Sequence, residues 1–305
     1  MNTLSGFLLF RLNFVDRQDL FQKPIASDAD FIKVIELAAT QDFDYARQGP
    51  RSSYRWALRA VNIGSVEEGN RPFIDVVYSC EVTSRRGPII TPKGITQGTS
   101  TVNPPSATLV HVLIDLKRHI FAIQDVTSVI QARASWRKSF ETILDSAAWS
   151  LGFTSMIRLN PVVPAEVLAT SIKSFDKVTR LRVTLRLPNP DLGPSFQRLY
   201  EEMQKGGVRE LTEDMRNERG LTLEPETLPQ AVLDMAVKGY RKGKIHLYGY
   251  KDGQRDEFTV ADDVARVEVS EVRNFIEGYA AGQSSATVKR FAQAIIQKID
   301  ENVSK

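Results

Sequence analysis

The sequence TRLRVTLRL occupies residues 179–187 and, from Arg180 to Leu187, alternates basic or hydroxyl side chains with apolar ones. Successive side chains of a β-strand point to opposite faces of its sheet, so this alternation predicts a strand with one apolar and one polar face. The apolar face would carry Leu181, Val183, Leu185 and Leu187. The polar face would carry Arg180, Arg182 and Arg186. A strand of this kind is typical of an antiparallel sheet with one solvated face.

The remaining sequence mixes strand and helix patterns around this segment. Alternating or β-branched runs predict strands at residues 4–15, 54–63, 72–83, 109–116, 120–125, 153–159, 177–187, 244–250, 257–260 and 264–269. Apolar spacing of three and four predicts helices at residues 28–39, 131–151, 164–172, 195–205 and 228–238, and from 285 onward. Residues 208–218 fit either a helix or an exposed strand, and residues 85–105 are rich in Gly, Pro, Ser and Thr, which predicts a long mobile loop.

These elements indicate an α+β fold: largely antiparallel β-sheets with segregated helices, in one or two lobes. Pro161 and Pro164 mark a soft boundary. We therefore expect an N-terminal α+β domain at 1–160 and a C-terminal α+β domain at 161–305, which ends in an amphipathic helix.

Composition narrows the class of protein. Cys80 is the only cysteine among 305 residues, which excludes disulfides within the chain and zinc sites built on paired cysteines. No apolar run is long enough for a signal peptide or a membrane span, so we expect a cytoplasmic protein without direct membrane insertion. The three histidines are scattered, and phosphate-binding, dinucleotide-binding and nucleophile-elbow motifs are absent. The sequence therefore predicts no metal, no cofactor, no catalytic residue and no enzymatic activity.

Charge is distributed unevenly along the chain. Residues 1–45 have a net charge of −3, residues 46–200 of +9, and residues 201–305 of −3. A basic middle between mildly acidic ends favours an anionic partner for the central region.

Three basic clusters could contact nucleic acid. The first is the arginine row Arg180, Arg182 and Arg186, because planar guanidinium groups suit phosphate oxygens. The second contains Arg55 and Arg59, and the third interleaves aromatic residues with Lys238, Arg241, Lys242 and Lys244. Lys117 and Arg118 form a smaller cluster at a predicted hairpin tip. Each cluster could instead be an ordinary solvated face, with its cations paired to carboxylates of neighbouring strands.

A metal-dependent nuclease is a further hypothesis. Such an enzyme needs Asp and Glu-x-Lys on adjacent strands to hold a divalent cation. Asp75 with Glu81 is the nearest candidate, but the lysine is missing, and Asp115 could also meet Asp125 across a hairpin.

The order of elements around residues 175–187 and 240–298 resembles that of the RexA-like phage-exclusion proteins and, more distantly, of the KwaB proteins of Kiwa phage-defence systems. The resemblance covers about the last two-thirds of the chain. It implies sequence-independent DNA binding in bacterial or prophage defence, as a homo-oligomer, with a partner defence protein that can be membrane-bound.

The leading expectation is therefore sequence-independent binding of duplex DNA within an anti-phage defence system. The alternative is a non-catalytic scaffold subunit whose basic face binds an acidic protein.

Overall fold

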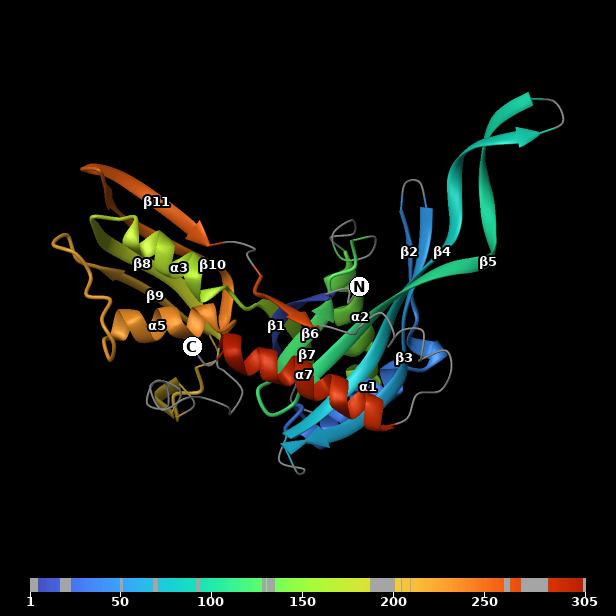
Figure 1. Cartoon of the computed structure of the whole chain (residues 1–305), viewed down its shortest axis with the longest axis horizontal. Helices are drawn as coiled ribbons and strands as arrows, with labels where there is room; N and C mark the ends of the chain where they lie inside the picture. The colour runs from blue at the N-terminus through green and yellow to red at the C-terminus, as the bar shows by residue number, and fades with distance from the viewer. Residues whose placement is uncertain are drawn as a thin grey trace.

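Two antiparallel sheets organise the chain, each with helices packed against it (Figure 1). The computed structural model describes residues 5–16, 23–49, 52–67, 71–91, 94–127, 130, 135–186, 201–203, 205–208, 210–260, 264–269 and 285–303. The fold is α+β, as the sequence predicts.

The first sheet has the strand order β12-β1-β6-β5-β4-β3-β2, and β7 pairs with the second half of β1. Its strands are β1 (Ser5–Asp16), β2 (Tyr45–Gln48), β3 (Ser52–Val66), β4 (Arg71–Thr91), β5 (Gly94–Asp115), β6 (Ile120–Gln124), β7 (Ser155–Pro161) and β12 (Arg266–Val269). Alternation along β1 assigns its apolar residues to two cores on opposite faces of the sheet. Phe10 and Leu12 belong to one core, and Phe7 and Leu9 belong to the other.

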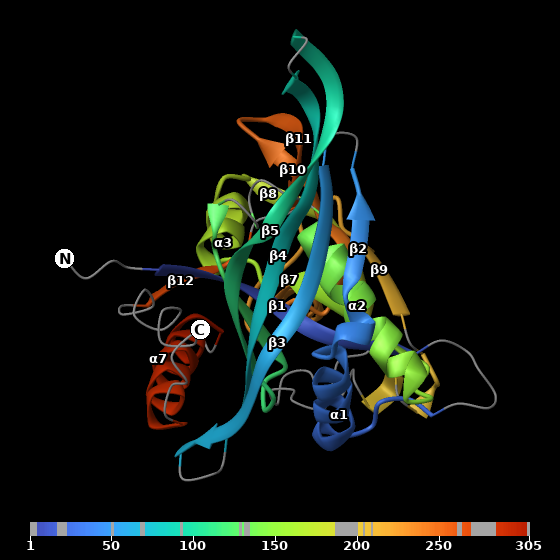
Figure 2. The same ribbon diagram turned by 90° about the vertical axis from the view of Figure 1, so that its right-hand side faces the viewer.

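Helices cover both faces of the first sheet (Figure 2). On one side lie α1 (Asp28–Ala38) and α2 (Trp136–Ser150), with a short 3-10 helix, η1 (Gln41–Phe43), after α1. The hydroxyl of Ser27 accepts a hydrogen bond from the backbone N–H of Asp30 and caps α1, as its sequence predicts. On the other side, α7 (Ser285–Val303) buries Val288, Phe291, Ile295 and Ile299.

The second sheet has the order β11-β10-β8-β9. Its strands are β8 (Lys177–Arg186), β9 (Glu210–Arg216), β10 (Arg241–Lys251) and β11 (Gln254–Val260). The helices α3 (Ala165–Lys173) and α5 (Leu228–Val237) pack on one face of this sheet. Leu181, Val183 and Leu185 are buried there, so the alternation of the opening sequence is confirmed.

The segment at 85–105 is a correction to the sequence analysis. It is not a loop: β4 and β5 continue through it as a hairpin whose pairs run from Arg85↔Ser100 to Thr91↔Gly94. Pro88 is tolerated because this part of β4 pairs with β5 alone, so the missing N–H breaks no second ladder. The turn-forming composition concealed a ribbon supported by β-branched Ile and Thr residues.

The expected division at residue 160 is also corrected. After β11 the chain returns to the first sheet, where β12 pairs with β1 and α7 covers its apolar face. The second lobe is therefore an insertion into the first one rather than the C-terminal half of the chain.

Two further predictions concern residues 208–218, left open between helix and strand, and the helix at 195–205. Residues 210–216 form the strand β9, which resolves the choice left open for 208–218. The helix expected at 195–205 falls mostly outside the described residues. Within the described ranges, no helix is long and apolar enough to cross a membrane.

Candidate nucleic-acid interface

The face of the second sheet opposite α3 and α5 gathers basic side chains from three strands. We define the basic sheet face by Arg180, Arg182, Arg186, Arg216 and Lys242. The antiparallel register places Arg182 beside Asp214 of β9 and His246 of β10. The side chains of residues paired across two strands point to the same side of the sheet. The predicted arginine row and part of the predicted 238–244 cluster therefore meet on this face.

Two carboxylates of β9 lie among these cations. Asp214 accepts two hydrogen bonds from Arg180, at 2.6 and 2.7 Å, and two more from Arg216, at 3.2 and 2.8 Å. Those hydrogen bonds, first from Arg180 and then from Arg216, hold the pKa of the Asp214 carboxyl well below its ordinary value. The basic side chains therefore outnumber the carboxylates that pair with them.

Glu210 is the second shared carboxylate. It lies 2.7 Å from the Lys242 ammonium and 3.3 Å from the Arg186 guanidinium, and its pKa is lowered, chiefly by the bond with Lys242. Arg182 is exposed and forms no ion pair with any described residue. Five cations and two carboxylates leave this face positively charged.

An open hollow with two tyrosines adjoins the basic sheet face. Its volume is about 740 Å³, and its lining includes Lys177, Arg180, Tyr248, Tyr250 and Arg255. The Arg180 guanidinium lies 5.0 Å from the centre of the Tyr248 ring, and the Lys177 ammonium lies 4.7 Å from that of Tyr250. Aromatic rings with nearby cations can stack on bases or sugars.

The acidic side of this hollow lies along β11 and the end of β9. Glu218, Asp256 and Glu257 line it there. Glu257 lies 3.0 Å from the Nδ1 atom of His246, and this hydrogen bond lowers the pKa of the Glu257 carboxyl. Apart from Arg255 of β11, the cations of this hollow therefore lie on β8 and at Arg216 of β9.

A bulge between Tyr248 and Gly249 shapes the hollow. A Cβ atom at Gly249 would collide with the carbonyl oxygen of Lys177, so the close approach of β8 and β10 requires glycine here. Alternation along β10 sends Tyr248 and Tyr250 to the same hollow, and the extra residue of β8 at the bulge lets Lys177 and Arg180 line it together.

The predicted pair Arg55 and Arg59 lies elsewhere, on the first sheet. Arg55 pairs with Glu81 at 2.5 Å, and Arg59 pairs with Asp44 at 2.8 Å. Each of these two guanidinium groups has one carboxylate partner. This is the arrangement of an ordinary solvated face, the alternative that the sequence left open.

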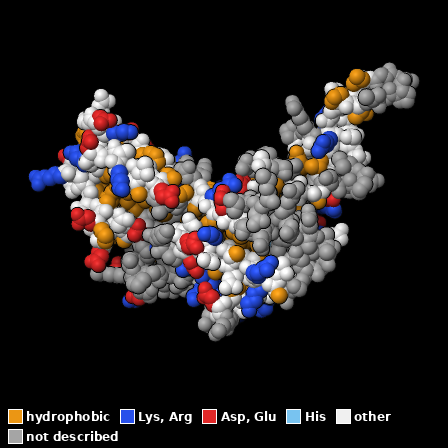
Figure 3. Space-filling model, viewed as in Figure 1, with side chains coloured by type: hydrophobic (Ala, Val, Ile, Leu, Met, Phe, Trp, Pro, Cys, Tyr) orange, Lys and Arg blue, Asp and Glu red, His pale blue; other side chains and the backbone are white. Residues whose placement is uncertain are grey.

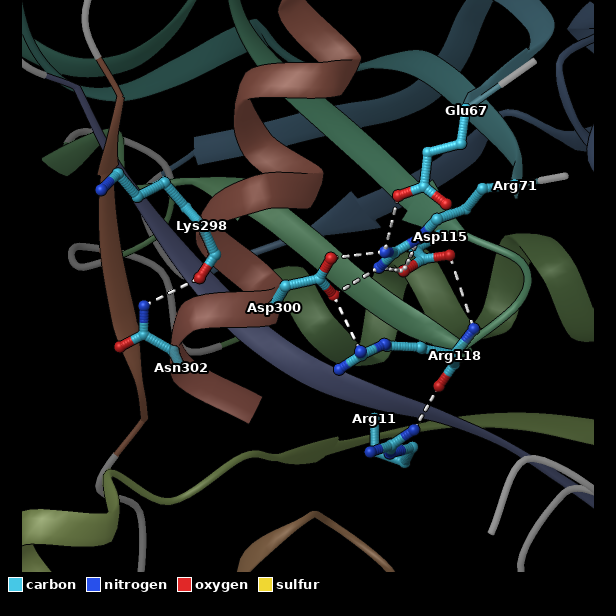
Figure 4. Close-up of polar contacts among 8 residues, drawn as sticks. All are labelled: Arg11, Glu67, Arg71, Asp115, Arg118, Lys298, Asp300 and Asn302. Atoms are coloured by element: carbon cyan, nitrogen blue, oxygen red, sulfur yellow. Dashed lines mark hydrogen bonds and ion pairs between the residues drawn. The ribbon is translucent and has the colours of Figure 1, made fainter. Parts of the chain in front are cut away.

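Lys117 and Arg118 lie in the turn between β5 and β6, where Lys117 is exposed. The Arg118 guanidinium lies 3.0 Å from Asp300 of α7, in a network with Arg71 and Asp115 (Figure 4). Arg118 therefore helps to hold α7 against the first sheet, which fits the alternative left open by the sequence, a cation paired with a carboxylate.

Arg241 is a further correction. Its ladder partner is Leu185, whose side chain lies in the core, so Arg241 also points inward and is only 2% exposed. Its guanidinium donates to the carbonyl oxygens of Gly243 and Val260 at 2.8 and 3.1 Å. A phosphate outside the protein cannot reach this side chain.

The other two lysines of that cluster differ from each other. Lys238 caps the end of α5 and is half-buried, and its carbonyl oxygen accepts a hydrogen bond from Arg11 of the first sheet. Lys244 is exposed within an irregular stretch of β10 between Lys242 and His246.

The carboxylates of the nuclease hypothesis do not converge. Asp75 and Glu81 share one face of β4 but stand six residues apart, about 20 Å along a strand. Asp75 is fully buried 3.0 Å from His111, whereas Asp115 pairs with Arg71 and Asp125 with Arg266. Across the described ranges, no three His, Cys, Asp or Glu side chains are placed to hold a metal ion.

A family comparison covers this site. The family described as Domain of unknown function (DUF4747) matches residues 101–278, more than half of the chain. The chain belongs to the DUF4747 family. The matched region of this DUF4747 protein contains all four strands of the second sheet. No curated protein matches the sequence.

Sequence reasoning missed three cations of this surface: Lys177, Arg216 and Arg255. Arg216 lies in the segment whose secondary structure was ambiguous, and its place beside Arg180 follows only from the β8–β9 register. Lys177 precedes the quoted stretch, and strict alternation would place it with Leu181 and Val183. Only the irregular pairing of β8 with β10 brings it into the hollow with Arg180, so the sequence pattern could not have found it.

Proposed function

We propose that this DUF4747 protein binds duplex DNA through the basic sheet face, by phosphate contacts and without reading base sequence. The proposal depends on the excess of cations over carboxylates on this face. Asp214 and Glu210 are each shared between two cations, and the exposed Arg182 lies beside them. Strands fix these side chains in rows, so little conformational entropy is lost when phosphates bind.

The basic sheet face by itself is a surface for phosphates and not for base edges. Sequence is usually read by an element that enters a groove, whereas contacts to phosphates position a protein without specifying bases. The described part of the basic sheet face is a row of side chains on strands, with hydroxyl groups of Thr184 and Thr212 3.0 Å apart between the cations.

The test is a fluorescence-anisotropy titration of random-sequence duplex over a range of salt concentrations. Arg182→Glu with Arg216→Glu should weaken binding roughly tenfold or more and reduce the slope of log K against log salt by about 2. Arg182 has no ion-pair partner among the described residues, and Arg216 has only the exposed contact with Asp214, so the melting temperature should fall only slightly.

Lys33→Glu with Lys298→Glu is the matched control. It changes the net charge by the same amount, on helices of the first lobe. Equal loss of affinity in both double variants would show that total charge, and not this surface, governs binding.

A scaffold function is the alternative, because a basic face already bridged by carboxylates can also receive an acidic protein. Undetectable DNA binding by the wild type at low salt would favour it. A role in phage exclusion, with a homo-oligomer and a partner defence protein, is proposed on the resemblance alone. Plaque counts on cells with and without the gene test that role.

A further inference from the structure

A two-stranded ribbon leaves the body of the molecule at the far end of β4 and β5. We define the arm as residues 85–91 and 94–100. Pairing with β3 ends at Arg85, so beyond this residue β4 and β5 pair only with each other. The arm stands clear of the body (Figures 1 and 3) and is about 20 Å long for seven residues per strand.

The composition of the arm points to a polyanion. No acidic residue occurs between Glu81 and Asp115, whereas this stretch contains three basic residues. Arg85 and Arg86 are both exposed and form no ion pair with any described residue. Alternation sends them to opposite faces of the ribbon, so each face carries one guanidinium.

The shape of the arm suits a close approach to a nucleic-acid backbone. Gly87 pairs with Gly98 across the ribbon: a Cβ at Gly87 would meet nothing within 4 Å, whereas the side chain of Ile89 lies against Gly98, so the open part of this face is at Gly87. Hydroxyl side chains of Thr96 and Thr99 can donate to phosphate oxygens. Near the tip, Ile95 is 74% exposed.

We infer that this arm enters a groove of B-form DNA, with Arg85 and Arg86 on the flanking phosphates. The inference rests on the proposed function for the identity of the ligand. The major groove of B-DNA is about 12 Å wide and admits a two-stranded ribbon, whereas the major groove of A-form RNA is too narrow. An exposed apolar side chain such as Ile95 can also press between base steps. Two acid-free arms from two copies of the chain would repel each other, so a second copy is a poorer occupant.

The experiment compares a DNA duplex with an RNA duplex of the same sequence by fluorescence anisotropy. In an arm-shortened variant, the two residues Asn-Gly replace residues 86–99 and form a tight turn between Arg85 and Ser100. The β4–β5 strand pairs outside the arm are then kept. The wild type should prefer DNA, and the variant should bind DNA about tenfold more weakly and lose that preference while its RNA affinity is unchanged. Arg85→Ala with Arg86→Ala should reduce the salt slope for DNA by about 2.

The outcomes separate this inference from the proposed function. If the arm-shortened variant keeps wild-type DNA affinity and preference while Arg182→Glu with Arg216→Glu weakens binding, the arm inference alone is wrong. If the wild type binds neither duplex, both are wrong. A loss of oligomer in sedimentation without a loss of DNA affinity would identify a second copy of the chain as the arm's occupant.

Discussion

At the scale of single residues, Asp214 sets how many charges the basic sheet face offers. Its carboxylate accepts hydrogen bonds from both Arg180 and Arg216, so each guanidinium must share its donors between Asp214 and an external phosphate. Arg182 lies opposite Asp214 in the β8–β9 ladder, but it forms no ion pair with a described residue and its side chain is exposed. We therefore expect Arg182 to contribute more to binding per residue than Arg180.

The pH dependence of stability should report the Asp214 contacts. Its pKa is lowered in the folded protein, so its contribution to the free energy of unfolding is complete above the unfolded pKa, about 4, and is lost as pH falls through the lower folded value. Asp214→Asn should therefore be less stable than the wild type near neutral pH, and the difference should shrink below about pH 4. Urea denaturation across that range measures it.

Asp256→Asn serves as the control, because Asp256 is exposed and forms no ion pair with a described residue. A difference between wild type and Asp214→Asn that stays constant down to pH 2 would contradict the assigned contacts.

At the scale of elements, the ion network of Figure 4 fastens α7 to the hairpin turns of the first sheet. Arg71 is almost buried and donates to Asp115, which is fully buried, at 2.5 Å and to Asp300 of α7 at 2.6 Å. Burial opposes the charge of Arg71, but hydrogen bonds from Arg71 to Asp300 and Asp115 outweigh it and raise the pKa of Arg71.

Removal of the two partners should have unequal costs. Asp115→Ala leaves a buried guanidinium partly uncompensated and should destabilise the protein by about 3–5 kcal/mol. Asp300→Ala should cost about 1 kcal/mol, because Asp300 is partly exposed and Arg71 keeps Asp115. Urea denaturation of both variants tests this order, with Glu67→Ala as a control near zero; equal losses for Asp115 and Asp300 would contradict it.

Most elements could be predicted from sequence because their apolar periodicity is local. The α2 stripe and the β8 alternation need no knowledge of distant residues. The arm could not be predicted in this way, since its Gly and Pro content is typical of loops and its strands are defined by their pairing with each other rather than by an apolar period. The inward direction of Arg241 and the sharing of Glu210 depend on register between strands far apart in sequence.

At the scale of the whole molecule, the second lobe is inserted between β7 and β12 of the first, and Arg11 of β1 joins them. Its guanidinium donates to the carbonyl oxygen of Lys238 and lies 4.5 Å from the centre of the Tyr240 ring. The hydrogen bond from Asn13 to the carbonyl oxygen of Gly239 adds to the junction. The basic sheet face is thereby presented on a firmly attached lobe, while the arm extends from the other.

Lysine footprinting of the wild-type protein tests the central claim most directly. Reductive methylation with and without saturating random-sequence duplex, read by mass spectrometry, compares lysines of the basic sheet face and its hollow with lysines of the first lobe. DNA should protect Lys177 and Lys242 and leave Lys33 and Lys298, whose side chains are 63% and 42% exposed, as reactive as before. Unchanged reactivity at Lys177 and Lys242, or equal protection of all four lysines, would contradict binding at the basic sheet face.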